Sequence, residues 1–156
     1  MLILKRLTSP LGGLAALFAL WLPWVHLECS STQVKPNLWQ LADQQTELYL
    51  LAAMALILVL AAAGMVMTAK GAWTLGTALA ACLGIAGWIY LWIRKDDIGR
   101  QQATVEGLGG ALGVWMQELI VTPETGFYLY LAGMLLGLLG AVLYLWLPGQ
   151  TPASEA

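Results

Sequence analysis

Long apolar stretches alternate with short polar segments along this chain. The four longest lie at about residues 7–25, 48–68, 72–93 and 127–147, and none carries an ionisable residue in its central part. A hydrocarbon layer roughly 30 Å thick is crossed by about 20 helical residues, and each stretch meets that length within a few residues. The pattern predicts four membrane-spanning helices in a single transmembrane domain that covers residues 1–156.

The connections predict how these helices are arranged. Only residues 69–71 separate the second and third stretches, so these helices are expected to be antiparallel neighbours joined by a short inner turn. Two outer loops then cover about residues 28–46 and 94–125. The expected fold is all-α, an integral membrane four-helix bundle with one inner turn and two outer loops.

Two short segments predict where helices begin, and a third bears on whether the first apolar stretch is retained. Thr8-Ser9-Pro10 and Thr122-Pro123-Glu124 each combine a hydroxyl group with a proline, which predicts a helix start at both places. The residues before Cys29 are not the small residues of a lipoprotein cleavage site. The first apolar stretch is therefore expected to be a retained span.

Composition agrees with a membrane protein. The chain is 60% hydrophobic and 10% charged with a mean hydropathy of +0.75, whereas about 25% of the residues in soluble domains are charged. The formal net charge is −2 and no basic cluster is present, which excludes nucleic acid as a partner. The expected surroundings are a lipid bilayer.

The placement of basic residues favours both termini in the cytoplasm. With the N-terminus inside, three basic residues lie on the inner side and four on the outer side: Lys5, Arg6 and Lys70 against Lys35, Arg94, Lys95 and Arg100. Lys and Arg decide orientation, whereas acidic residues contribute little. The preference therefore rests on Lys5 and Arg6, which precede the first span.

Small residues recur at four-residue spacing in the third and fourth spans. These are the expected helix-packing residues, because glycine and alanine let helices approach closely in lipid: Gly76, Ala80, Gly84, Gly133, Gly137 and Ala141. Gly126, Gly133 and Gly140 also recur at a spacing of seven. These faces could pack within the bundle or against another copy of the chain.

Residues able to carry chemistry are few. His26 is the single histidine, and with Cys29 it supplies only part of a metal site, so no metal and no cofactor is expected. A bridge from Cys29 to Cys82 would exceed the reach of a disulfide, because Cys82 falls halfway down the third span. The span centres offer only Thr74, Thr77 and Cys82, and catalysis or ion transport usually needs more strongly polar groups at that depth. No catalytic residue is expected, and the chain is not expected to be an enzyme.

The outer side carries most of the candidate contact residues for a ligand or partner. They are Trp21, Trp24, His26, Cys29, Trp88, Trp92, Trp115 and Glu118. Leu108, Leu112, Trp115 and Leu119 share one helical face, which predicts an interfacial helix in the second outer loop. The glycines between 107 and 113 keep an irregular or re-entrant loop open as an alternative.

The segment from Trp21 to Cys29, with its Pro-Trp pair and later cysteine, resembles the first-helix exit in uncharacterised small four-span bacterial membrane proteins. That resemblance implies a multi-pass protein of the bacterial inner (plasma) membrane and brings no known activity with it. A likeness to claudin-type tetraspan proteins fails, because the first outer loop is too short for their sheet and lacks their cysteine pair.

These observations favour a non-catalytic small membrane protein that acts as an accessory subunit or scaffold through helix–helix packing, as a homo-oligomer or inside a larger membrane complex. A homo-oligomeric pore or conduit for cations or small molecules is the first alternative, with Glu106, Glu118 and Glu124 concentrating cations at its mouth. The second alternative is a lipid- or quinone-binding protein with its site among the outer tryptophans.

Overall fold

The computed structural model describes residues 2–29, 32–43, 45–68, 71–105 and 120–146. Its elements in chain order are α1 (Leu2–Ala19), β1 (Val25–Cys29), β2 (Thr32–Val34), α2 (Leu38–Ala42), the 3₁₀ turn η1 (Thr46–Leu48), α3 (Tyr49–Thr68), α4 (Gly71–Val105), β3 (Ile120–Pro123) and α5 (Thr125–Trp146).

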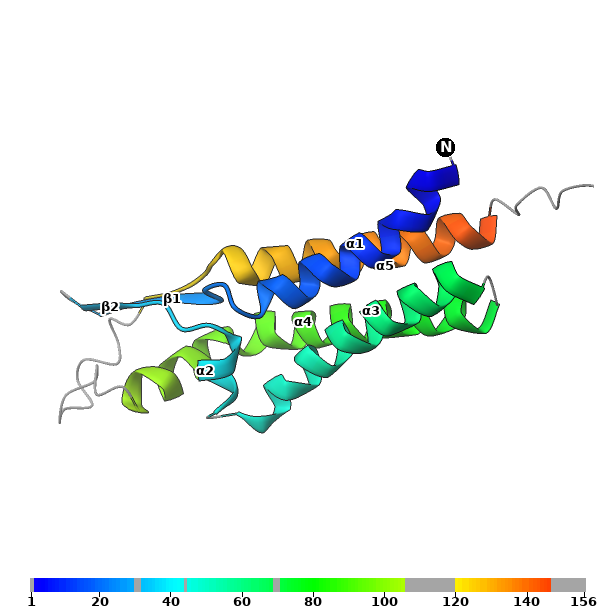
Figure 1. Cartoon of the computed structure of the whole chain (residues 1–156). Coiled ribbons are helices and arrows are strands. Elements are labelled where there is room, and N and C mark those ends of the chain that lie inside the picture. Colours follow the sequence, from blue (N-terminus) through cyan, green and yellow to red (C-terminus); the bar gives the residue numbers. More distant parts are fainter. Residues whose placement is uncertain (1, 30–31, 44, 69–70, 106–119, 147–156) are drawn as a thin grey trace, which may run out of the picture.

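The four longer helices form a bundle with strands at one end (Figure 1). α1 lies along α5, and α3 lies along α4. The start of α1 and the end of α5 lie at the same end of the bundle, and the strands lie at the opposite end.

Three helical segments are long and apolar enough to cross a membrane, by length and composition: Thr46–Met67, Ala72–Gln101 and Thr125–Trp146. The apolar part of α1 is shorter, from Leu7 to Ala19. The predicted first span to residue 25 was therefore too long. The helix tightens into i→i−3 hydrogen bonds after Leu17, and the indole N–H of Trp24 then donates to the carbonyl of Ala19 at 2.7 Å, which closes the helix end.

The predicted helix start at Thr8-Ser9-Pro10 was wrong. α1 begins at Leu2 and contains Pro10, although a proline inside a helix removes one backbone donor. The Ser9 hydroxyl does not cap the helix but donates to the carbonyl of Gly137 at 3.0 Å, in the buried contact between α1 and α5. The second predicted start is nearly right, because α5 begins at Thr125, one residue beyond the strand that holds Thr122 and Pro123.

The second outer loop begins later than predicted. α4 does not end at residue 93 but continues as helix to Val105. Hydropathy falls at Arg94, yet no proline follows before Val105, and Arg94 Nε lies 3.3 Å from Asp97 Oδ2 one turn on. Residues 106–119, where the interfacial helix was predicted, lie outside the described residues.

The first outer loop is a structured segment, which the all-α prediction missed. β1 pairs with β2 on one side and with β3 on the other, both antiparallel, in the order β2-β1-β3. The third strand comes from the second outer loop, so the shortness of the first loop did not prevent a sheet. We call the sheet, α2 and the part of α4 from Arg94 onward the cap.

Alternation along β1 fixes how the sheet sits on the bundle. Val25 and Leu27 are buried, whereas His26 and Glu28 point to the opposite face. A methyl group added at Gly99 of α4 would lie 2.5 Å from a methyl of Val121 and 3.1 Å from one of Leu27. The glycine therefore lets the apolar face of the sheet rest directly on α4.

The predicted glycine faces of α5 pack inside the chain. A methyl group added at Gly133 would lie 2.6 Å from backbone atoms of both Gly12 and Ala16 in α1. One added at Gly137 would meet Leu58 of α3 at 2.9 Å, and one at Gly140 would collide with Ser9. Ala141 is also buried. Close helix contact requires these small residues, as the spacing indicated, and the partner helices belong to the same chain.

The small residues of α4 are less uniform. Met134 of α5 occupies the space beside Gly84, and a methyl group added at Gly84 would lie 2.6 Å from the Met134 sulfur. Ala80 is buried. Gly76 is looser, since its nearest neighbour is the methyl of Ala61 at 3.8 Å. At the end where α3 and α4 are connected, the ring of Trp73 covers Gly64.

Two alanine substitutions test the contact between α1 and α5. Gly133→Ala should lower the free energy of unfolding by about 1–3 kcal/mol, because the added methyl meets backbone that cannot move aside. Gly76→Ala has room and should be neutral or stabilising by up to about 1 kcal/mol, through helix propensity. Thermal unfolding in one detergent measures both. Equal effects of the two substitutions would contradict the assigned packing.

Candidate functional site

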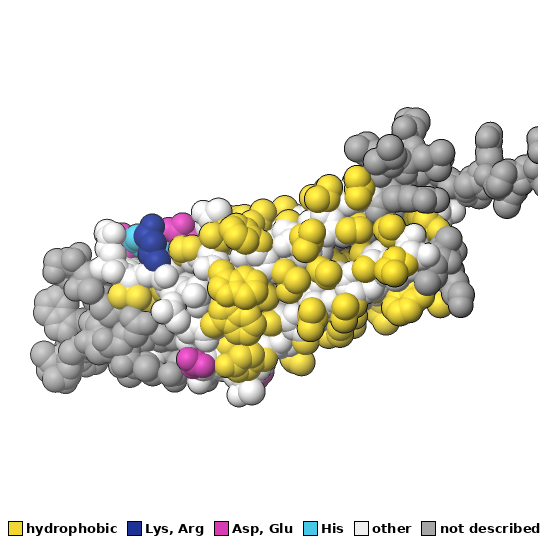
Figure 2. All heavy atoms as spheres, viewed as in Figure 1, with side chains coloured by type: hydrophobic (Ala, Val, Ile, Leu, Met, Phe, Trp, Pro, Cys, Tyr) yellow, Lys and Arg dark blue, Asp and Glu magenta, His cyan; other side chains and the backbone are white. Residues whose placement is uncertain are grey.

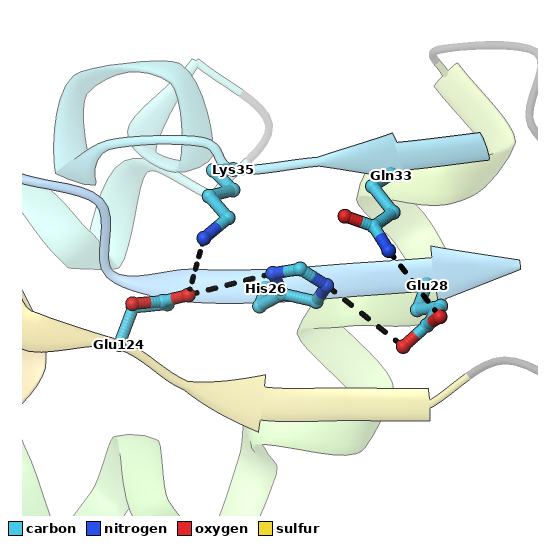
Figure 3. Close-up of polar contacts among 5 residues, drawn as sticks. All are labelled: His26, Glu28, Gln33, Lys35 and Glu124. Carbon is cyan, nitrogen blue, oxygen red and sulfur yellow. Dashed lines mark hydrogen bonds and ion pairs between the residues drawn. The ribbon is translucent and has the colours of Figure 1, made fainter.

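The polar face of the sheet gathers side chains from three separate segments (Figure 3). His26 and Glu28 alternate with the buried residues of β1, and the β1–β2 register pairs Glu28 with Gln33. Lys35 directly follows β2, and Glu124 directly follows β3. Strand pairing places all five on one face, and we call them the polar cluster.

Glu124 is the centre of the polar cluster. Its Oε1 accepts a hydrogen bond from Lys35 Nζ at 2.9 Å and lies 3.4 Å from His26 Nδ1. The other imidazole nitrogen, Nε2, lies 3.9 Å from Glu28 Oε2. Gln33 Nε2 donates to Glu28 Oε1 at 3.3 Å. The imidazole thus lies between the carboxylates of Glu124 and Glu28, and the Lys35 ammonium group binds that of Glu124.

Lys35 also affects the titration of Glu124. Its ammonium group donates to the carboxylate and holds the pKa of Glu124 below its ordinary value of 4.5, and partial burial opposes that shift. The side chain of Glu124 is 25% exposed and that of Lys35 is 51% exposed, so the ion pair is screened by solvent and its stabilising effect is modest.

Within the described residues, no three His, Cys, Asp or Glu side chains are placed to hold a metal ion. Cys29 ends β1, next to the cluster in sequence, but its side chain is outside the description. Cys82 is exposed on α4 and is a free thiol.

An aromatic core lies beneath the cap, where α1, α4 and α5 meet. Trp24 is 1% exposed, with its ring 5.9 Å from Phe127 and 5.3 Å from Tyr130. Trp88 packs on Phe127 at 4.8 Å and stacks on Trp92 at 5.6 Å. Trp24, which was predicted as an outer contact residue, is therefore enclosed, while Trp92 remains partly exposed.

Hydrogen bonds fix this aromatic core. The indole N–H of Trp88 donates to the carbonyl of Phe127 at 2.9 Å, and the Tyr130 hydroxyl donates to the carbonyl of Leu51 at 3.0 Å. The second bond is buried and joins α5 to α3. Buried indole and phenol groups need such partners, because an unpaired polar group in an apolar interior is costly.

A second aromatic group faces outward. Trp21 is 60% exposed, and its ring lies 5.8 Å from that of Trp39, which in turn lies 6.2 Å from Tyr49. The Tyr49 hydroxyl donates to Asp43 at 3.2 Å. Amphipathic rings in this position are typical of the level where a membrane meets water.

The structure brings some of the predicted contact residues together and separates others. His26 is in the polar cluster, Trp88 and Trp92 are in the aromatic core, and Trp21 is in the outward group. Trp115 and Glu118 lie outside the described residues. Sequence reasoning missed the pairing of Lys35 with Glu124 across 89 positions; the alternation in residues 25–29 was the available signal, because it indicates a strand.

No protein family, curated relative or solved structure matches this chain. The resemblance to small four-span bacterial membrane proteins therefore stays an expectation from the sequence.

Removal of the Lys35 ammonium should change how stability depends on pH. The pKa of Glu124 is lowered in the folded protein, so its contribution is present at neutral pH and is lost as pH falls below about 4.5. Lys35→Met should raise the pKa of Glu124 and reduce the part of the acid destabilisation that Glu124 causes. Carboxyl NMR titration and unfolding between pH 3 and 7 measure these effects. Lys95→Met, which removes a separate ion pair with Asp96, is the control and should leave Glu124 unchanged.

The bond from Tyr130 to α3 can be tested by removal of one oxygen atom. Tyr130→Phe should lower the free energy of unfolding by about 1 kcal/mol, because it removes the buried hydrogen bond to Leu51. Tyr128→Phe alters a side chain that is 51% exposed and should have an effect near zero. Chemical unfolding of the two variants compares them directly, and a neutral Tyr130→Phe would show that the bond contributes no net stability.

Proposed function

We propose that this chain is a small non-catalytic integral membrane protein that serves as an accessory subunit or scaffold, with its cap as the surface that contacts a partner protein. In this proposal α1, α3, α4 and α5 lie in the inner membrane of a bacterium. The cap lies on the outer side, and both chain ends face the cytoplasm.

The distribution of side chains on the surface carries this proposal. Exposed hydrophobic side chains form a band across the helices, and the charged side chains in view lie beside the cap (Figure 2). Of the residues whose side chains are described, every Lys, Arg, Asp and Glu lies in the cap, in the segments that connect its elements, or at the helix ends that adjoin it. An exposed apolar surface of this extent must be shielded from water. For an apolar band across a helix bundle, lipid is the surrounding that fits.

Because the glycine faces are occupied within the chain, we assign the partner-binding surface to the cap and not to these helix faces. Helix–helix packing was predicted to hold the protein to its partner, yet the tight contacts at Gly133, Gly137 and Gly140 are made to α1 and α3. A partner that used these faces would have to displace parts of the same chain. The cap instead offers the two outer strands of a sheet and an apolar residue, Ile120, that is 56% exposed on β3.

The buried polar groups agree with a packing role for the helices. In the part of the chain that the structure describes, the buried polar side chains are the hydroxyls of Ser9, Thr74 and Thr77. Ser9 and Thr77 donate to backbone carbonyls, of Gly137 and Trp73 respectively. We therefore assign the hydroxyls of Ser9 and Thr77 to helix contacts and give no preference to the alternative of a pore. The buried hydroxyl of Thr74 has no hydrogen-bond partner among the described residues.

Labelling of single cysteines tests the membrane arrangement. In a Cys29→Ser, Cys82→Ser background, Gln40→Cys on α2 should react with a membrane-impermeant maleimide in intact cells. Met67→Cys, at the opposite end of the bundle and 84% exposed, should react only after permeabilisation. Retention of the chain in the membrane after alkaline extraction is also expected. Release into the supernatant would overturn the membrane proposal, and the reverse labelling pattern would overturn the orientation.

Partner contact is tested with a matched pair on β3. Native mass spectrometry of the protein in mild detergent should show a larger partner in fixed stoichiometry. Ile120→Lys should reduce that complex at least tenfold, because it places a charge in an apolar contact. Thr122→Lys, on the same face of the strand and exposed, should retain more of it. A chain found only alone or only with copies of itself would contradict the accessory role.

A further inference from the structure

α3 and α4 separate toward the cap and leave a groove between them. The two helices are close at the end of α3 and the start of α4, and they lie further apart at their other ends (Figure 1). The groove has a volume of about 500 Å³, within the range of roughly 300–1,000 Å³ that is usual for small-molecule sites.

Apolar side chains line the groove along both helices. Leu50, Leu51 and Met54 contribute from α3, and Leu83 and Ala86 contribute from α4. The lining of α4 spans residues 83 to 91, which is roughly 12 Å of helix at 1.5 Å per residue. The groove is elongated and apolar, and it opens at the polar end of the helices. These properties fit a hydrocarbon chain that enters from the level of the cap.

Charged groups of both signs stand at the mouth of the groove. The Tyr90 hydroxyl donates to Glu47 Oε2 at 2.7 Å and accepts from Arg94 Nη1 at 3.0 Å. The guanidinium carbon of Arg94 lies 5.7 Å from the centre of the Tyr90 ring. A carboxylate from the start of α3 and a cation from α4 are thus held together by one phenol, directly above the apolar lining.

The Arg94 side chain is 42% exposed, so its terminal nitrogens can meet a ligand at the mouth. Its Nε is buried beside Asp97 Oδ2 at 3.3 Å and does not take part. A guanidinium group binds phosphate oxygens well, because its N–H donors form a planar fork. The mouth therefore offers a place for a phosphate beside a carboxylate that would accept from an ammonium group.

We propose that the groove binds one acyl chain of a phospholipid with a primary-amine headgroup, its phosphate on Arg94 and its ammonium on Glu47. This inference rests on the membrane location proposed above. An anionic headgroup fits less well, because Glu47 and Asp97 place two carboxylates around one guanidinium. An isoprenoid quinone would fill the groove but has no cation for Glu47.

The test titrates the delipidated protein in detergent with phosphatidylethanolamine and with phosphatidylglycerol, and native mass spectrometry counts the bound lipid. One phosphatidylethanolamine per chain is expected, with at least tenfold weaker binding of phosphatidylglycerol. Ala86→Phe should weaken binding at least tenfold, because the ring occupies the groove. Arg94→Gln removes the positive charge at the mouth, together with the contacts to Tyr90 and Asp97, and should weaken binding roughly tenfold. Leu139→Phe, on the exposed side of α5, is the control and should stay within twofold of the wild type.

Each other outcome overturns the inference. Absence of bound lipid, unchanged binding by both groove variants, equal binding of the two headgroups, or a copurified quinone in place of lipid would each do so. Circular dichroism and thermal unfolding verify that the variants are folded, and Arg94→Gln leaves the apolar packing intact. A chain that stays in the membrane after alkaline extraction but binds no lipid fails only this inference, whereas a chain that is released fails the proposed function.

Discussion

Close backbone contact between α1 and α5 is the constraint on which the other features depend. Gly12 and Gly133 let the two helices approach until a single added methyl would meet main-chain atoms. β1 follows α1 and β3 precedes α5, so the antiparallel helices continue into antiparallel strands, with Val25 paired to Pro123. The same contact brings the end of β3 beside β1 and so places Glu124 next to His26. The polar cluster therefore depends on the packing of α1 against α5, although the aromatic core separates it from that contact.

Local hydropathy was enough to predict the long helices but not the elements of the cap. The apolar stretch that ends at residue 25 includes both the end of α1 and the start of β1. Pro23 and the alternation of Val25, His26, Leu27 and Glu28 are the sequence signals that mark the change of structure. Helix α4 extends beyond its apolar stretch because helix propensity and contacts with the sheet continue past Ile93. Such non-local support cannot be deduced from one segment alone.

The site was predictable to a similar degree. His26 was singled out because it is the only histidine, but its neighbours Lys35 and Glu124 come from segments whose proximity depends on strand pairing. Trp24 was grouped with outward tryptophans on the basis of its position near a helix end. Its side chain instead turns inward, since its N–H closes α1 and its ring fills the space next to Phe127. For Trp24, the position in the sequence did not indicate the direction of the side chain.

The length of α4 has a mechanical consequence. Its 35 residues make a rod of about 52 Å, whereas the hydrocarbon layer of a bilayer is roughly 30 Å thick. In the membrane arrangement proposed here, some 20 Å of the rod stand outside that layer, and the sheet rests on that part at Gly99. Helices change their tilt to match bilayer thickness. α4 would then act as a lever, so that a thinner or thicker membrane swings the cap sideways and exposes a different part of it to whatever lies beside the protein.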